Sequence, residues 1–214
     1  MEQRKEDWLR ATAGSVGGTA AYDATARQKN GTYTAKRKNK MAELLIERLE
    51  GKRTVIPVSK EMQWGVDNEE GGRNRYSFEN GVIVQEVGLI KHPAILWSHY
   101  SPDGLVDDDG LIEIKCPTTS THLTTLVTEQ IPENYITQMQ WGMAVSGRDW
   151  CDYVSFDPRI PNAKAQYFQK RVYRDNSLID TLEDEITKFI NELDDMVARF
   201  VDKYGEIDVE RIAA

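Results

Sequence analysis

The stretch Ser101-Pro-Asp-Gly-Leu-Val-Asp-Asp-Asp-Gly-Leu-Ile-Glu-Ile-Lys115 decides the predicted fold. The three aspartates and the glycine at its centre are a strong turn signal between two apolar runs, so the stretch predicts a β-hairpin. Residues two apart in a strand share a face, so Glu113 and Lys115 should point together while Ile114 faces the opposite, buried side. The turn should also bring Asp103 back beside them. We therefore expect two carboxylates and one amine at one sheet edge.

This trio suits the metal-assisted hydrolysis of a phosphodiester. Two carboxylates are suitable ligands for Mg²⁺, which acidifies a bound water and neutralises charge on the phosphate. A lysine beside them can orient the attacking water or help to deprotonate it. Asp103 followed ten residues later by Glu113-Ile-Lys115 matches the signature of the PD-(D/E)xK nucleases. The same residues also fit an ordinary turn and an amphipathic strand with an exposed ion pair, so the spacing alone leaves both interpretations open.

The flanking sequence predicts a central mixed β-sheet flanked by helices, an α/β class. Further strands are expected at 82–90, 95–98, 153–156 and 166–173, and helices at 41–50, 60–78 and 132–145. Residues 23–40 read as an exposed loop. Apolar residues at steps of three and four predict a long amphipathic helix over about 178–204, which fits a monomer core as well as an oligomer contact. The length of 214 residues fits a single domain, 1–214.

Composition excludes several protein classes. Two cysteines, Cys116 and Cys151, cannot build a disulfide scaffold or a four-cysteine zinc or iron–sulfur site. No apolar run is long enough for a membrane span, and the N-terminus lacks the apolar core of a signal peptide. We therefore expect a cytoplasmic protein without a membrane partner.

The net charge of −8 is unevenly distributed. Residues 1–60 hold 13 Lys and Arg against 7 Asp and Glu, whereas residues 175–214 hold 4 against 12. No acidic residue lies between Ala24 and Ala42. Such a segment could follow a phosphate backbone, and a solvated loop would explain the same charge. If DNA is the substrate, this basic N-terminal part is where we expect the duplex to be held.

Segments along most of the chain, residues ~8–205, resemble one known family. Ser101-Pro-Asp-Gly followed by Glu113-Ile-Lys-Cys-Pro is similar to the motifs of the phage lambda exonuclease, or YqaJ-type viral recombinase, family of PD-(D/E)xK nucleases. Four weaker segments follow the family order: Trp8–Gly14, Trp64-Gly65 with Glu69, Tyr135 with Gln138-Met-Gln140, and Phe156-Asp-Pro-Arg159.

The resemblance implies a restriction-endonuclease-like core and an enzyme that acts on the ends of linear double-stranded DNA. Family members are Mg²⁺-dependent exonucleases, and Mn²⁺ can replace Mg²⁺ as their metal. They degrade one strand 5′ to 3′, release 5′-phosphomononucleotides and leave 3′ single-strand overhangs. The resemblance further implies a ring-shaped homotrimer, a single-strand annealing protein as partner, and a phage- or prophage-encoded protein in a bacterial host.

The resemblance also implies roles for individual residues. Asp103, Glu113 and the backbone carbonyl of Ile114 would bind the metal, Lys115 would position the water, Glu69 would complete the metal site, and Gln138 would bond close to it. Without the resemblance, solvated or polar positions on a helix face would be the favoured interpretation for Glu69 and Gln138.

Several positions are expected to contact DNA, although they depart from the family pattern. Thr12 and Thr121 occupy the two positions where lambda-like members carry arginines for the 5′-phosphate, and Arg10 lies near the first. The remaining expected contacts are Thr19, Ser101, Gln140 and the apolar Met62, which aligns with a residue that wedges into the duplex end. Since both bidentate donors are missing, we expect a weaker preference for 5′-phosphorylated ends.

Three alternatives compete with the exonuclease interpretation. The first is an endonuclease on the same core. The second is a related nuclease with an iron–sulfur cluster, against which the cysteine count argues. The third is a non-catalytic DNA-end binding protein, which would have no need of acids that repel one another without a metal.

Overall fold

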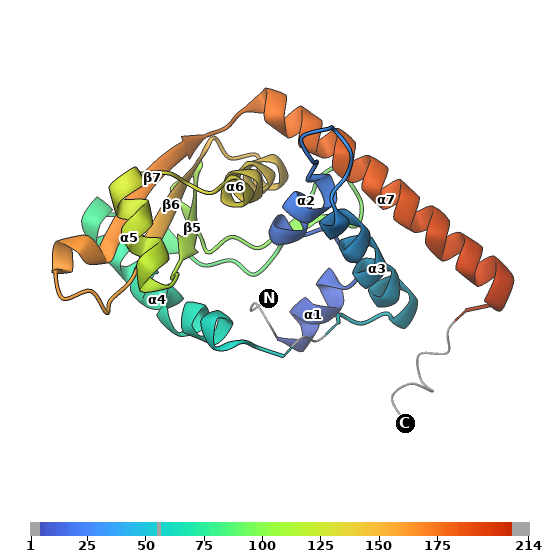
Figure 1. Cartoon of the computed structure of the whole chain (residues 1–214), viewed down its shortest axis with the longest axis horizontal. Helices are drawn as coiled ribbons and strands as arrows, with labels where there is room; N and C mark the ends of the chain where they lie inside the picture. Colours follow the sequence, from blue (N-terminus) through green and yellow to red (C-terminus); the bar gives the residue numbers. More distant parts are fainter. Residues whose placement is uncertain (1–4, 55–56, 207–214) are drawn as a thin grey trace.

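A five-stranded sheet forms the centre of the computed structural model, which describes residues 5–54 and 57–206 (Figure 1). The strand order is β1-β4-β5-β6-β7. The strands are β1 (Val84–Gln85), β4 (Gly104–Val106), β5 (Gly110–Lys115), β6 (Trp150–Phe156) and β7 (Tyr167–Tyr173). β5 and β6 run parallel, while the other neighbouring pairs are antiparallel. The prediction of a mixed sheet is confirmed.

The predicted hairpin forms β4 and β5. Gly104 pairs with Ile112, and Val106 pairs with Gly110. Parallel neighbours require a crossover connection, and between β5 and β6 this connection contains α5 (Thr119–Thr128) and α6 (Glu133–Ser146). The crossover places α6 over the face of the sheet to which Glu113 points.

Helix α4 (Lys60–Asn80) covers the other face of the sheet. It begins after Ser59, whose side chain caps its N-terminus, and ends at Gly81 in the left-handed conformation that favours glycine. A Cβ added at Gly72 would lie 2.8 Å from Cγ2 of Ile114. Glycine therefore permits the helix to approach the strand closely, which offsets its poor helix propensity.

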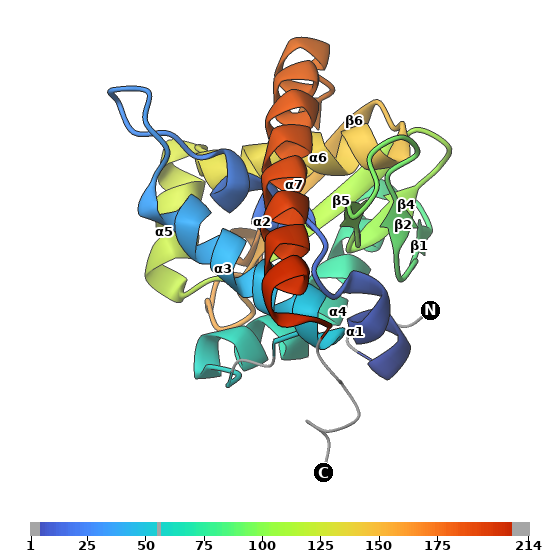
Figure 2. The ribbon, with the colours of Figure 1, turned by 90° about the vertical axis from the view of Figure 1, so that its right-hand side faces the viewer.

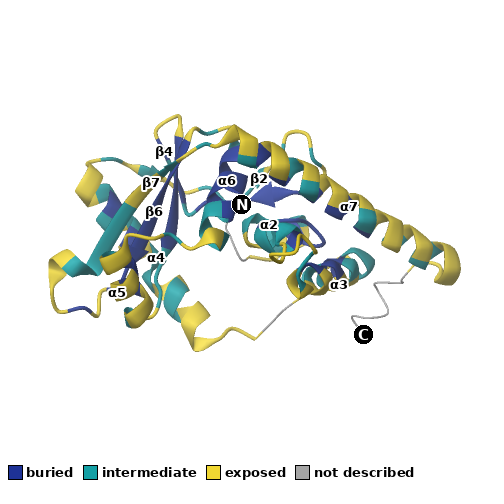
Figure 3. Cartoon of the chain, turned by 45° about the horizontal axis from the view of Figure 1, so that its top comes forward, coloured by how far each residue is buried: buried dark blue, intermediate teal, exposed yellow. Residues whose placement is uncertain are grey.

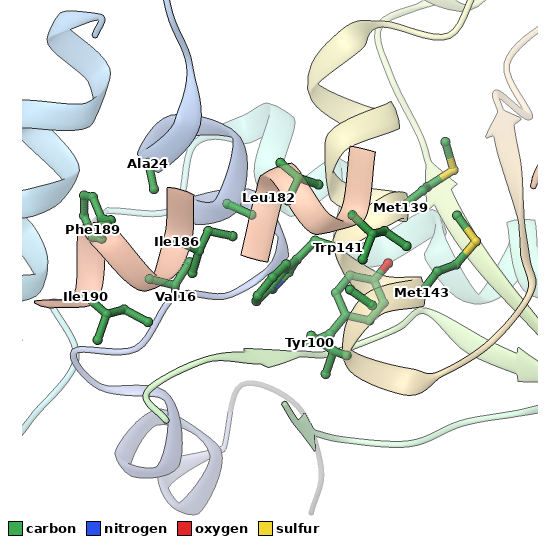
Figure 4. Close-up of a cluster of buried hydrophobic side chains, with 14 of the residues drawn as sticks. Val16, Ala24, Tyr100, Met139, Trp141, Met143, Leu182, Ile186, Phe189 and Ile190 are labelled. Atoms are coloured by element: carbon green, nitrogen blue, oxygen red, sulfur yellow. The ribbon is translucent and has the colours of Figure 1, made fainter. Parts of the chain in front are cut away.

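Helix α6 lies between the sheet and the remaining long helices, α2 (Gly18–Thr25), α3 (Ala35–Glu50) and α7 (Asn176–Tyr204) (Figure 1). The main apolar cluster fills this region, with Tyr100, Trp141, Ile186 and Phe189 among its buried members (Figure 4). Burial is densest in the central strands and the inner faces of these helices, and the outer side of α7 is exposed (Figure 3).

The minor elements are α1 (Glu6–Thr12), a 3-10 turn at Ala163–Gln166, and a two-stranded ribbon of β2 (Ile90–Lys91) and β3 (His99–Tyr100). None of the helices within residues 5–54 and 57–206 has the length and apolar character needed to cross a membrane.

The acidic α7 packs against the basic N-terminal part (Figure 2). Arg27 pairs with Glu185 at 2.9 Å, and Arg37 pairs with Glu192 at 2.8 Å. Arg48 likewise binds an α7 carboxylate at 2.8 Å. These three arginines are thus paired within the chain, and the prediction that this part holds the duplex stays a prediction.

The structure departs from three of the predicted elements. The strand predicted at 95–98 is wrong: Nδ1 of His92 accepts the N–H groups of residues 94 and 95, and Trp97 has a φ of 58°, so the chain bends there. The strand predicted at 82–90 is reduced to β1 and the start of β2. The loop predicted at 23–40 contains the first turns of α3, which begins at Ala35 rather than Met41.

Candidate active site

Glu113 on β5 is 1% exposed, and three donors hold its carboxylate. The Tyr100 hydroxyl donates to Oε2 at 2.6 Å, and Nε2 of Gln138 donates to Oε1 at 2.7 Å. Nζ of Lys115 donates to the same Oε1. A carboxylate offers about four lone-pair positions, so one remains for a cation. Three elements, β3, β5 and α6, therefore fix this acid.

Lys115 is held between acidic neighbours. Burial alone would lower the pKa of Lys115, but the Glu113 and Asp103 carboxylates outweigh it and raise that pKa above its usual value. The lysine therefore stays protonated in this arrangement. It is suited to donating a hydrogen bond to a water rather than to removing a proton from it.

Asp103 lies immediately before β4, and its Oδ2 accepts the N–H of Ile114 at 2.6 Å. Burial and the nearby Glu113 carboxylate raise the pKa of Asp103 well above its usual range, although Lys115 opposes the shift. Within residues 5–54 and 57–206, no donor reaches the second oxygen, Oδ1. The acid is thus destabilised in its charged form and has an oxygen available to a cation.

The backbone at Ile114 contributes to the same place. In a paired strand, the N–H and C=O of one residue point to the same side. The N–H of Ile114 points to Asp103, so the carbonyl of Ile114 faces the same side of β5. This position lies just past the Gly104–Ile112 pair, at which β4 begins.

These oxygens fit a hard cation such as Mg²⁺. Asp103, Glu113 and the Ile114 carbonyl would hold it, as the resemblance implies, and it would relieve the repulsion between the two acids. No three histidine, cysteine, aspartate or glutamate side chains of the described ranges gather as a metal-binding group. The candidate site therefore relies on two carboxylates and a backbone oxygen.

Arg73 on α4 is a residue of this site that the sequence analysis missed. Its Nε donates to the backbone carbonyl of Asp103 at 2.9 Å, and its Nη2 donates to Oε1 of Glu69 at 2.8 Å. Nη1 lies 3.0 Å from Glu86. Arg73 thus ties the predicted helix acid to the segment of Asp103. Its spacing of four residues from Glu69 on a predicted helix was the available signal.

Residues 7–149 match the family model described as the YqaJ-like viral recombinase domain. The chain belongs to this family. Its structure is similar to the crystal structure of an alkaline exonuclease from Laribacter hongkongensis, with 44% identity over 93% of this chain and 97% of that chain, and a TM-score of 0.86. The complex of that enzyme with dAMP gives 43% identity, the same coverage and a TM-score of 0.87.

A phage related exonuclease from Haemophilus somnus shares the fold, with a TM-score of 0.67 at 16% identity over 87% of this chain and 96% of that chain. No curated protein matches the chain. The predicted nuclease fold of this family is confirmed. The Ser101-Pro-Asp-Gly and Glu113-Ile-Lys-Cys-Pro motifs carry the acids and the lysine of the site described above.

Two of the predicted DNA contacts are wrong. Thr12 is 1% exposed, and its hydroxyl binds the Trp8 carbonyl and accepts a hydrogen bond from Arg53. Gln140 is 2% exposed, and its side chain bonds to the backbone of Tyr173 and Asp175. Residues two apart on a helix point in nearly opposite directions, so α6 cannot present both Gln138 and Gln140 to the site.

The other predicted DNA contacts lie on or near the surface, where their roles stay predictions. Arg10 is exposed and paired with Glu6 at 2.8 Å. Thr19 is exposed on the first turn of α2. Thr121 is exposed on the first turn of α5, and Met62, 46% exposed, is on the first turn of α4. Ser101 accepts a hydrogen bond from Nε1 of Trp8 at 3.0 Å.

Asp157 and Arg159, recognised only as a motif, connect the elements around the site. Both carboxylate oxygens of Asp157 accept hydrogen bonds from the Arg159 guanidinium. The hydroxyl of Thr119, at the start of α5, donates to Oδ2 of Asp157 at 2.6 Å. The guanidinium of Arg159 lies 4.0 Å from the ring centroid of Trp64 on α4 and bonds to the Pro117 carbonyl. These contacts join α4 to the segment that leaves β5.

Proposed function

We propose that this protein is a Mg²⁺-dependent exonuclease that degrades one strand of linear double-stranded DNA in the 5′ to 3′ direction. It would release 5′-phosphomononucleotides and leave 3′ overhangs for phage-type recombination. The observation that carries the proposal is the convergence of Asp103, Glu113 and Lys115 at the open end of the β4–β5 hairpin, inside the sheet of a YqaJ-family chain. The alkaline exonuclease with 44% identity supports the reaction class.

The residues divide the work as follows. Asp103, Glu113 and the Ile114 carbonyl would hold the metal, which would supply a Lewis acid for the phosphate and a more acidic water. Lys115, kept protonated by the two acids, donates a hydrogen bond that orients the attacking water. Tyr100 and Gln138 keep the Glu113 carboxylate in place.

The wider setting follows from the family resemblance. We propose that the enzyme works in the cytoplasm of a bacterial host beside a single-strand annealing protein, as a homotrimer. Mn²⁺, which accepts similar oxygen ligands, would substitute for Mg²⁺.

The test is digestion of linear duplex labelled at either the 5′ or the 3′ end, with Mg²⁺, Mn²⁺ or a chelator. The wild-type protein should release the 5′ label as a mononucleotide, spare closed circular DNA and stop when the metal is removed. Asp103→Ala should bind DNA ends without digesting them. Cutting of circular DNA would instead identify an endonuclease, and end binding without cleavage would identify a DNA-end binding protein.

A further inference from the structure

The ammonium group of Lys115 has two kinds of contact, one with carboxylates and one with an aromatic ring. Among residues 5–54 and 57–206, its Nζ makes one hydrogen bond, to Oε1 of Glu113, and the Asp103 carboxylate also attracts it. The same Nζ lies 5.0 Å from the ring centroid of Tyr135, within the distance of a cation–π contact. Tyr135 is the uncharged one of these three neighbours.

Tyr135 is held by the elements that also position the acids. It lies on the first turn of α6, three residues before Gln138, so both side chains extend from the same face of the helix. Its ring stacks on the buried ring of Tyr153 on β6, with 5.8 Å between the centroids and 25° between the planes. Tyr153 pairs with Glu113 in the sheet. The Tyr135 ring is therefore fixed beside β5, on the face to which Glu113 points.

The hydroxyl of Tyr135 takes no part in this arrangement. It makes no hydrogen bond to any of the residues that the structure describes. By contrast, the hydroxyls of Tyr76 and Tyr100 each donate to a buried carboxylate. The contact with Lys115 therefore depends on the face of the Tyr135 ring alone.

A divalent cation at the candidate site would affect the two kinds of contact differently. It would offset the charge of Glu113 and Asp103 and would repel the ammonium group of Lys115, so the carboxylates would hold this lysine less firmly. The flexible four-carbon stem of lysine does not fix the amine by itself. The face of an uncharged ring attracts the ammonium group with or without the cation.

We propose that Tyr135 is a positioning residue whose ring keeps the Lys115 ammonium group directed at the attacking water when the acids bind their metal. Tyr135 would act through Lys115 rather than through a contact with DNA. This inference rests on the proposed function, because that function gives Lys115 the task of orienting the water.

The experiment compares digestion of linear duplex with Mg²⁺ by the wild type, Tyr135→Leu and Tyr135→Phe. Tyr135→Leu should lower kcat by about five- to thirtyfold, the range of a desolvated cation–π contact. KM should stay unchanged, so that kcat and kcat/KM fall together, because the lost contact serves the transition state and does not hold the substrate. Tyr135→Phe should keep the wild-type kcat, because it retains the ring face.

Phe168→Leu is the matched control. Phe168 on β7 packs against the same apolar cluster and lies 6.4 Å from the Tyr153 ring between centroids, but it makes no contact with Lys115. This variant should lose some stability and keep the wild-type kcat. An equal fall in kcat for Phe168→Leu and Tyr135→Leu would show that general loosening of the cluster is responsible, and would overturn the proposal.

Nuclear magnetic resonance tests the contact without measuring activity. Protons above an aromatic ring shift upfield, so the Cε protons of Lys115, in protein with isotope-labelled lysine, should show this shift in the wild type and in Tyr135→Phe. The shift should persist when Mg²⁺ is added and should be absent from Tyr135→Leu. Its loss from the wild type on addition of Mg²⁺ would overturn the proposal.

The two measurements also separate this inference from the proposed function. A wild-type kcat for Tyr135→Leu, or a kcat for Tyr135→Phe as low as that of Tyr135→Leu, overturns the role of the ring. If Tyr135→Leu does not fold, the Lys115 signal of the wild type with and without Mg²⁺ decides. If the wild type does not cleave DNA, the exonuclease proposal fails, and the same signal still decides whether the ring holds Lys115.

Discussion

Two carboxylates of the central sheet region, one buried and one half-buried, have opposite surroundings. Asp152 on β6 receives four hydrogen bonds: from the Tyr76 hydroxyl at 2.7 Å, from Gln169 at 3.0 Å and from two nitrogens of Arg171 at 2.9 Å. Asp103 receives a single backbone N–H and faces another acid. A buried acid whose lone pairs are filled holds the fold together, whereas a half-buried acid with spare lone pairs and a raised pKa indicates a functional site.

Replacing the site acid should produce the largest change in activity. Asp103→Asn keeps an oxygen for the Ile114 N–H but removes the charge that binds a cation. Digestion of linear duplex should fall about a thousandfold, since a lost metal interaction is worth several kcal/mol in the transition state. The free energy of unfolding in the absence of metal should rise, because a repulsion is removed. If Asp103→Asn instead lost stability and kept its activity, Asp103 would be a structural acid like Asp152.

Replacing the structural acid should mainly affect stability. Asp152→Asn leaves Arg171 without its counter-ion and should lower the free energy of unfolding by about 2–4 kcal/mol. Urea denaturation followed by circular dichroism measures this change. The folded fraction should digest DNA at close to the wild-type rate per molecule. A specific loss of activity without destabilisation would place Asp152 in the site instead.

Arg73 combines a structural role with a role at the site. It pairs with the acids Glu69 and Glu86, and it also holds the segment that carries Asp103. Arg73→Gln should lower kcat for digestion by about ten- to a hundredfold, in the range seen when groups that orient metal ligands are removed. Arg73→Lys should recover part of the loss. Titration calorimetry should show weaker binding of Mg²⁺ to Arg73→Gln. An unchanged metal affinity would show that Arg73 has only a structural role.

Asp157 should make the smallest contribution, an effect on stability that depends on pH. Burial opposes ionisation, but hydrogen bonds from Arg159 and Thr119 outweigh it and lower the pKa of Asp157 from 3.8 to about 2. Because the folded state holds this proton less tightly than the unfolded state, the stabilisation is present above about pH 4 and is lost as pH falls through about 2. Its size is about 1–2 kcal/mol, since Arg159 is partly exposed.

The measurement is the free energy of unfolding between pH 6 and pH 2 for the wild type and Asp157→Asn. The variant should be less stable at neutral pH and should lose less stability on acidification. Parallel curves would show that Asp157 does not contribute to the acid dependence.

Elements with local signals were predicted well from the sequence. The hairpin has its turn residues, α4 has Ser59 and Gly81 at its ends, and the helix predicted over about 178–204 is α7 from Asn176 to Tyr204. Helix α5 was missed, because its run of threonines has poor helix propensity and it is held by contacts such as His122 with Ser155.

The sequence predicted the two acids and the lysine of the candidate site but not the residues that hold them in place. Asp103, Glu113 and Lys115 are close in sequence, so strand geometry alone brings them together. Tyr100 and Arg73 approach from elements whose placement depends on the tertiary fold. The same limit explains Gln140, since no local pattern shows which side of α6 packs against Tyr173.

The crossover between β5 and β6 has a consequence for the order of folding. Glu113 and Lys115 lie on β5, and the parallel neighbour of that strand, β6, begins only at Trp150, after α5 and α6. A nascent chain released only to that point would have its catalytic strand without a partner on one edge. Closing so distant a contact is slow compared with forming a hairpin. The strand that carries Glu113 is therefore completed only by a long-range pairing, in which Glu113 lies opposite Tyr153 of β6.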